Sequence, residues 1–171
     1  GFDAEHFDPR AWHAIVDVPP FERQTARDRY WGAKRVAAYS LDELRAAIAA
    51  GRYRPAAADH LLRTLWQRRI RLARDFFGAV APLDYFHVRS DALCFTDLRV
   101  KSGLDGGAGV DYRAREDGRV VDVRHGSDDA GGACVALPRR EGYRVVELAA
   151  LRPGERHFGP RVAVHLMARA G

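Results

Sequence analysis

Residues 25–77 read TARDRYWGAKRVAAYSLDELRAAIAAGRYRPAAADHLLRTLWQRRIRLARDFF, and this stretch decides the fold. Two capping boxes divide it. Thr25 with Asp28, and Ser40 with Glu43, each place a hydroxyl three residues before a carboxylate, which satisfies the free amides of a helix start. The apolar residues between these signals recur at helical spacing. The stretch therefore predicts three helices in a row, over about 25–39, 40–51 and 55–77.

The ends of these helices carry their own signals. Gly51 suits the left-handed position that closes a helix, and Pro55 is a favoured first-turn residue of the next one. Apolar side chains at spacings of three, four and seven residues should share one core. The residues expected in that core are Leu44, Ile48, Leu61, Leu65, Leu72 and Phe76.

The first 24 residues are expected to form an extended segment that lies across another surface, because large apolar side chains are spread along it. These anchors are Phe2, Phe7, Trp12 and Phe21. Pro19-Pro20 is expected to block a helix there, since proline lacks the amide donor and restricts the residue before it.

Beyond Pro82 the apolar period shifts from about 3.6 residues toward 2, the signature of strands. Asp117-Gly118 stands between two alternating runs and is a strong hairpin signal. The candidate strands are 85–89, 92–98, 109–115, 119–124, 133–137, 143–150 and 161–168. The chain is thus predicted to be α+β, with a three-helix region and extended N-terminal segment over 1–81 and a small antiparallel β-sandwich or barrel-like domain over 82–171.

Composition excludes several classes of protein. A hydrophobic content of 47% argues against disorder, and no apolar run approaches the roughly 20 residues of a membrane span. The net charge of +5 hints at nucleic acid, but the arginines are interleaved with carboxylates along the whole chain. A dedicated phosphate-binding surface concentrates its basic residues, so nucleic-acid binding is disfavoured.

Arg69 is the candidate ligand-binding residue. At 100° per residue it falls inside the apolar arc of the third helix. A buried guanidinium needs at least one carboxylate or several backbone carbonyls as partners, and Asp28, Asp42 and Glu43 are plausible carboxylates. Two interpretations stay open: Arg69 binds an anion or another ligand in a pocket, or it is structural, either as an ion pair between helices or with its stem extended to the edge of the core.

Neither the cysteines nor the histidines form a metal site. Cys94 and Cys134 are expected to be two free buried thiols, with a disulfide as the alternative if the domain is exported. The histidines are scattered and show no helical zinc spacing. The acidic residues of loops 101–109 and 125–132 lack the alternating spacing of a calcium loop. No metal, cofactor or catalytic residue is therefore predicted.

The stretch ARDRYWGAKRVAAYSLDELRAAIAAGRYRPAAADHLLRTLWQRR, with FDPRAW upstream and PLDYF downstream, resembles the C-terminal part of a group of large uncharacterised bacterial proteins. The upstream region of those proteins resembles a divergent kinase-like fold. The resemblance covers roughly residues 2–98. It departs at Ile70, where those proteins have Asp after the paired arginines, so no local Arg–Asp pairing is carried over.

The resemblance implies that the chain is a piece of a longer bacterial protein. Its helices would complete the C-terminal lobe of a kinase-like body, and its strands would form an accessory module. An exported or envelope location is favoured, because such large proteins look exported. No catalytic residue is transferred, since the matching positions belong to structural helices.

Three functional hypotheses follow. The first is a non-catalytic accessory or interaction module whose partner is the rest of a longer chain or another protein. The second is a small enzyme or ligand-binding domain with a site around Arg69 and the histidines. The third is a weak nucleic-acid binder that uses its arginines.

Overall fold

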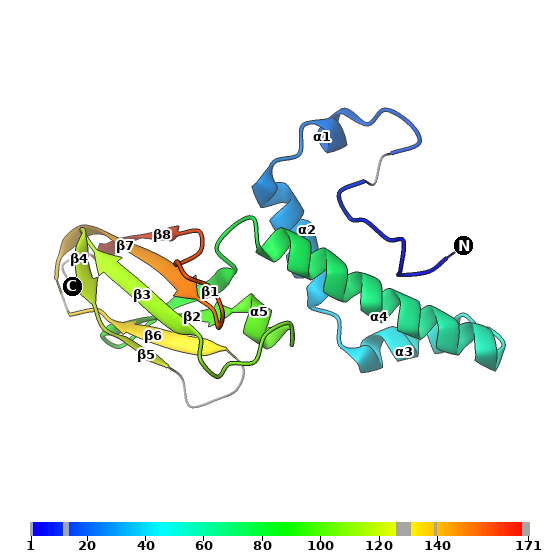
Figure 1. Cartoon of the computed structure of the whole chain (residues 1–171). Coiled ribbons are helices and arrows are strands. Elements are labelled where there is room, and N and C mark those ends of the chain that lie inside the picture. The colour runs from blue at the N-terminus through cyan, green and yellow to red at the C-terminus, as the bar shows by residue number, and fades with distance from the viewer. Residues whose placement is uncertain (1, 12–13, 126–130, 139, 169–171) are drawn as a thin grey trace. The chain divides into compact units, whose positions relative to one another are not determined.

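The computed structural model describes residues 2–11, 14–125, 131–138 and 140–168. It confirms an α+β chain, which divides into two compact units, Gly1–Phe77 and Gly78–Gly171. The first unit holds four helices, and the second holds two four-stranded antiparallel sheets and one short helix (Figure 1). Trp12 and most of loop 125–132 lie outside the described residues.

The helices of the first unit are α1 (Pro19–Glu22), α2 (Ala26–Ala37), α3 (Leu41–Ala50) and α4 (Pro55–Phe77). Both predicted capping boxes are present. Thr25 and Ser40 each accept a hydrogen bond from the amide three residues on, and the carboxylate at that residue accepts one in return. Because these signals are local, the starts of α2 and α3 were predictable from the sequence.

Two predictions about helix ends are wrong. Pro19-Pro20 does not block a helix but begins the single turn of α1, because proline lacks only an amide that the first turn leaves free anyway. Gly51 has φ of −75°, and Arg52 takes the left-handed position instead. Gly51 is small for another reason: a Cβ there would stand 2.4 Å from the Tyr53 ring.

The buried stripe of α4 differs from the predicted one. Ala73 and Phe77 are fully covered, with Thr64 and Arg69 on the same stripe, whereas Leu65 and Phe76 are only half-buried. At the C-terminal end of α4 the fully buried residues are therefore Ala73 and Phe77, each one position after the predicted core residues Leu72 and Phe76. α2 and α3 both pack against α4 and enclose this stripe.

The N-terminal segment lies along α4, as expected. Three of its backbone carbonyls are bound by side chains of that helix: His60 contacts the Phe2 oxygen at 2.8 Å, Arg68 donates to Asp3 at 2.7 Å, and Arg71 donates to Glu5 at 2.7 Å. The Arg68 guanidinium also lies 4.2 Å from the centre of the Phe2 ring. Contacts to main-chain carbonyls thus hold this segment on α4, whereas two of its expected aromatic anchors, Phe2 and Phe21, are exposed.

The second unit is built from eight strands and the helix α5 (Leu98–Lys101). The strands are β1 (Leu83–Arg89), β2 (Ala92–Asp97), β3 (Asp111–Glu116), β4 (Arg119–Val121), β5 (Val123–His125), β6 (Gly132–Ala136), β7 (Gly142–Leu151) and β8 (Val162–Ala168). One sheet has the order β1-β2-β6-β5 and the other β4-β3-β7-β8. The predicted strand 119–124 is divided, since β4 and β5 belong to different sheets and only Asp122 separates them.

The two sheets pack face to face around one apolar core, visible as two layers in Figure 1. Alternate residues of each strand point into it, as a sandwich requires. Phe95 of β2 meets Tyr112 of β3 edge to face, with ring centres 5.4 Å apart. The innermost side chains come from both sheets: Leu93, Phe95, Ala114, Val135, Val146 and Leu148.

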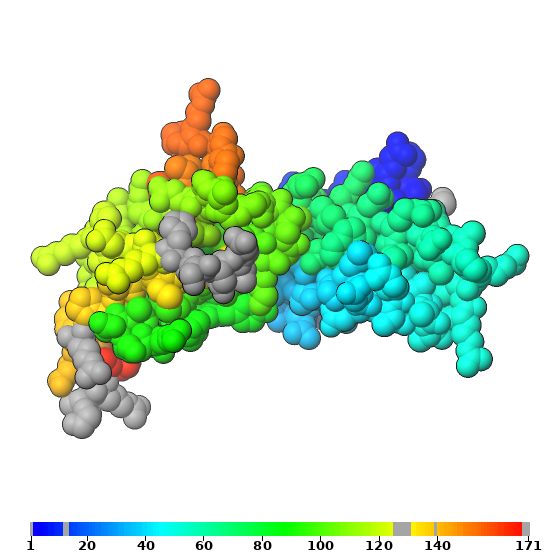
Figure 2. Space-filling model, turned by 90° about the horizontal axis from the view of Figure 1, so that it is seen from below, coloured from blue at the N-terminus to red at the C-terminus, as the bar shows by residue number. Residues whose placement is uncertain are grey.

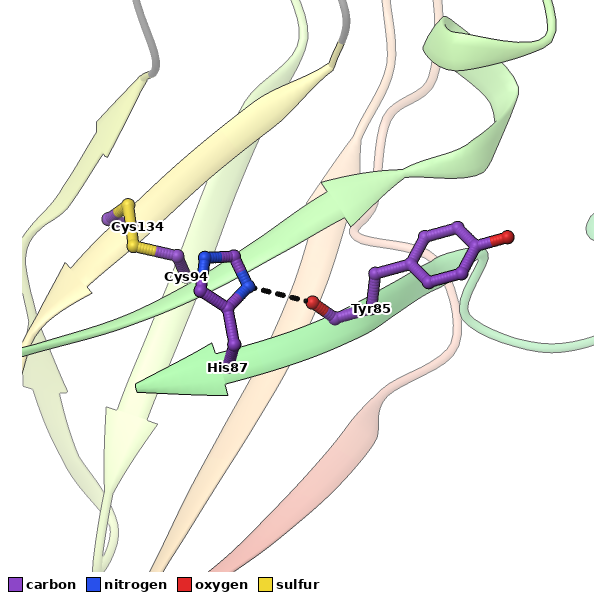
Figure 3. The surroundings of a disulfide bond; sticks show 4 residues. All are labelled: Tyr85, His87, Cys94 and Cys134. Atoms are coloured by element: carbon purple, nitrogen blue, oxygen red, sulfur yellow. Dashed lines mark hydrogen bonds between the residues drawn. A yellow bond between two sulfur atoms is a disulfide. The ribbon is translucent and has the colours of Figure 1, made fainter. Parts of the chain in front are cut away.

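The prediction of two free thiols is wrong, because Cys94 and Cys134 form a disulfide. The two residues stand directly opposite each other on the neighbouring strands β2 and β6. Both point to the outer face of their sheet, since Leu93, Phe95, Ala133 and Val135 occupy the inner face (Figure 3). Sequence could not reveal this pairing, because it depends on the register of strands 40 residues apart.

Reducing this disulfide should destabilise the β domain by about 2–4 kcal/mol, because the bond restricts a long loop in the unfolded chain. Urea titrations with and without reductant, followed by circular dichroism, measure the loss. A Cys94→Ser/Cys134→Ser double variant is the control and should not respond to reductant. Equal midpoints for the oxidised and reduced wild type would contradict the expectation.

The predicted hairpin turn is confirmed, with Asp117 at φ 46° and Gly118 at φ 84° between β3 and β4. Gly118→Val should cost about 1–2 kcal/mol, because a β-branched residue resists positive φ although the surrounding space is open. Thermal unfolding measures the change. Gly106→Val is the matched control, since Gly106 also faces open space but has no positive φ. An equal effect of both substitutions would show that the turn tolerates a side chain.

Candidate functional site

The outer face of the sheet β4-β3-β7-β8 carries alternating arginines. Along β3, Tyr112 and Ala114 point into the core, so Arg113 and Arg115 point outward. Their partners on β7 are fixed by register: Arg113 lies opposite Ala149, and Arg115 lies opposite Glu147. The small side chain of Ala149 leaves a hollow between the longer ones.

The chain that follows β7 returns beside this face and forms a wall. The Gly159 amide donates to the Ala150 carbonyl at 2.9 Å, which ties the segment to the strand. The Arg113 guanidinium lies 3.8 Å from the centre of the Phe158 ring, a stacked cation–π contact. This segment, orange in Figure 2, projects beyond the rest of the β domain.

Together these elements enclose an open cleft of about 470 Å³. It is lined by Arg113, Arg115, Glu147, Leu148, Ala149, Leu151, Arg156, His157, Phe158, Gly159 and Arg161. Four arginines therefore face a single carboxylate, a formal excess of three positive charges before His157 is counted. Clustered like charges repel one another, and an anion bound in the cleft would reduce this repulsion, so the cleft favours anion binding.

The arginines of the cleft differ in how they are held. Arg161 pairs with Glu147 at 3.4 Å, but both side chains are exposed and water screens the pair. Arg113 is fixed by its stack on Phe158. The side chains of Arg115 and Arg156 make no hydrogen bond or ion pair with any described residue, and Arg115 is half-buried. Donor groups are thus left over for a ligand.

A buried ion pair anchors the start of this wall. Arg152, the first residue after β7, donates to the Asp97 carboxylate at 3.0 Å and to Asp105 at 2.8 Å. Its backbone amide donates to Glu155 at 3.3 Å, which closes a turn at the entry to the segment. Arg152 therefore affects the cleft indirectly, because its contacts fix the place where the returning segment begins.

Arg69 lies elsewhere, in the helical unit, and does not line the cleft. It is buried, as predicted, and donates from Nε to the Tyr39 carbonyl at 2.9 Å and from Nη2 to the Ala37 carbonyl. Its guanidinium also lies 4.4 Å from the Trp66 ring centre. Arg69 thus closes the C-terminal end of α2, where cations are favoured. Burial lowers the pKa of its guanidinium, which still keeps its proton.

The carboxylates expected to pair with Arg69 are engaged in other contacts. Asp28 and Glu43 complete the capping boxes at the starts of α2 and α3, and Asp42 pairs with Arg45. For Asp28 and Glu43, hydrogen bonds from the capped backbone amides hold the pKa below its usual value. These carboxylates therefore bind groups three residues away on their own helix starts, and they do not form the long-range ion pair with Arg69.

The disulfide marks a second feature, on the outer face of the other sheet. His87 of β1 lies opposite Cys94, and its Nδ1 contacts the Tyr85 carbonyl at 3.0 Å (Figure 3). Because a carbonyl only accepts, this nitrogen carries the proton. The two sulfurs are bonded to each other, so neither is a nucleophile in this state.

Within the described ranges, no group of three or more His, Cys, Asp or Glu side chains is placed to hold a metal ion. None of the described helices is both long and apolar enough to cross a membrane. Comparison with known proteins adds no assignment, because no family, curated protein or solved structure matches this chain.

Sequence reasoning missed the cleft. Its signal was present in the run DYRARE, where two arginines alternate with core residues, and in PGERHFGPR, where basic and aromatic residues follow a turn. The first becomes meaningful only when the outer face of β3 is known. The second requires the chain to return to that face, which is a long-range event.

Replacing Arg69 with methionine should destabilise the helical unit by about 1.5–3 kcal/mol, because an apolar side chain cannot bind the Ala37 and Tyr39 carbonyls. Urea titration of the variant measures the change. Arg63→Met is the matched control, since Arg63 is exposed on the same helix. A loss no greater than that of the control would show that water replaces the guanidinium without cost.

Proposed function

We propose that this chain is a non-catalytic interaction module that holds an acidic partner in the arginine-lined cleft of its β-sandwich. The observation that carries this proposal is the charge of the lining: four arginines against one glutamate. Arg115 and Arg156 have no counter-ion among the described residues. An acidic group entering the cleft would supply the missing partners as charge-assisted hydrogen bonds.

The lining suits binding better than catalysis. A guanidinium keeps its proton at ordinary pH, so arginine does not serve as an acid or a base. Among the described residues no serine, threonine, cysteine or lysine lines the cleft, so its His157 has no nucleophile to activate there, and its carboxylate already faces Arg161. Arg69, the centre of the alternative enzyme hypothesis, is engaged with the backbone carbonyls of Ala37 and Tyr39 at the C-terminal end of α2. These features support a module that recognises a partner without changing it.

The disulfide supports an exported or envelope location for this module, since such bonds persist in oxidising compartments. The resemblance of the helical stretch supports the same setting and a place within a longer bacterial protein. In that proposal the helices complete a kinase-like body, and the sandwich presents its cleft to another part of the protein or to a separate partner.

Citrate, a tricarboxylate, is a simple probe of the cleft. At matched ionic strength it should raise the unfolding temperature of the β domain by about 2 °C or more relative to chloride, because it binds only the folded state. Circular dichroism follows the transition. An Arg113→Gln/Arg115→Gln variant should lose the increase, whereas Arg63→Gln/Arg89→Gln, which removes equal charge from other exposed positions, should retain it.

The same shift in both double variants would mean that citrate responds to overall charge, and the proposed cleft would be discarded. An absence of any citrate effect on the wild type would have the same consequence. Competition by a single-stranded oligonucleotide, with a steep dependence on salt, would instead favour the nucleic-acid hypothesis.

A further inference from the structure

The two arginines of β3 have a defined spacing. Arg113 and Arg115 are alternate residues of one strand and point to the same side, so their Cα atoms lie about 7 Å apart. An extended peptide places its own alternate side chains at the same interval and on the same side. A peptide lying along β3 could therefore present one side chain to each arginine.

The remaining lining fits such a ligand. Ala149, opposite Arg113, is only 5% exposed and its methyl group forms the floor of the cleft. A small floor allows another main chain to approach closely. Arg156 and His157 rise on the side of the returning segment, and Phe158 holds the Arg113 guanidinium by its face. The edges of that guanidinium, which carry its N–H donors, stay available.

We infer that the cleft recognises an extended peptide segment with acidic groups on alternate residues, of the form Asp/Glu-x-Asp/Glu. This inference rests on the proposed function and names the partner's chemistry. One carboxylate binds Arg113 and the next binds Arg115, and the pair offsets two of the three excess positive charges. Phosphorylated side chains at the same spacing present the same chemistry, because arginine binds carboxylate and phosphate alike.

Geometry favours a peptide over a free small anion. A single carboxylate can engage one guanidinium in a fork, but two guanidinium groups about 7 Å apart call for two anionic groups on one ligand. The cleft is also open at the surface of a sheet, as a site for a continuing chain must be. Its volume of about 470 Å³ exceeds what one carboxylate needs.

The test uses the full chain and fluorescein-labelled octapeptides. One peptide carries two glutamates at alternate positions in a Ser/Gly background. Its isomer carries the same glutamates side by side, so that an extended chain points them to opposite faces. Fluorescence anisotropy at low salt should give at least about fivefold tighter binding for the alternate isomer, a difference of roughly 1 kcal/mol.

Substitutions locate the effect. Arg115→Gln should weaken binding of the alternate isomer by about fivefold or more and so remove its advantage over the adjacent isomer. Arg63→Gln removes the same charge from the helical unit and should leave both affinities within about twofold of the wild type. Tighter binding of a phosphoserine peptide with the same spacing would support the site and identify phosphoryl groups as its better ligand.

Three results would overturn the inference: equal binding of the two isomers, equal effects of the two substitutions, or tighter Arg115-dependent binding of a single-stranded oligonucleotide than of either peptide. The citrate experiment distinguishes failure of the peptide inference from failure of the proposed anion-binding function. Citrate stabilisation without isomer preference would remove the peptide inference and leave the anion-binding module standing. Failure of both experiments would remove both.

Discussion

The β domain depends on one buried ion pair, Asp97 with Arg152. Asp97 is fully buried and accepts from the Tyr112 hydroxyl at 3.1 Å, from Arg152 at 3.0 Å and from the Arg99 backbone amide at 2.9 Å. A buried carboxylate without partners would cost several kcal/mol, so these groups must meet whenever the domain folds. They come from the end of β2, from β3 and from the residue after β7, which fixes both sheets at one point.

The pair belongs to a chain of alternating charges. Arg152 also contacts Asp105, and Arg99 holds the same carboxylate at 2.8 Å. Burial first, and then the Asp97 charge, raises the pKa of Tyr112, so its hydroxyl stays protonated and can donate. Arg152 is the first residue of the segment that forms one wall of the cleft. The buried network therefore fixes the position of that wall.

Local rules predicted much of the structure, although Pro19-Pro20 and Gly51 did not follow them. Both capping boxes and the Asp117-Gly118 turn depend on residues within four positions, and both are present. Alternation also placed seven strands, which together overlap all eight strands of the described sandwich. Strand 119–124 was predicted as one piece because alternation does not show where a chain leaves one sheet for the other. The disulfide and the cleft escaped prediction, since each depends on the register between distant strands.

The arginines illustrate why net charge is a poor guide to function. Arg69 binds helix-end carbonyls, Arg144 binds Glu116 and the Pro138 carbonyl, and Arg152 binds Asp97. These side chains are buried, so their charge serves the fold. The charge that can act on a partner is what remains after structural pairing. Within the described β domain, part of that remainder lies on one outer sheet face, where the alternation of β3 and the returning segment bring four arginines together.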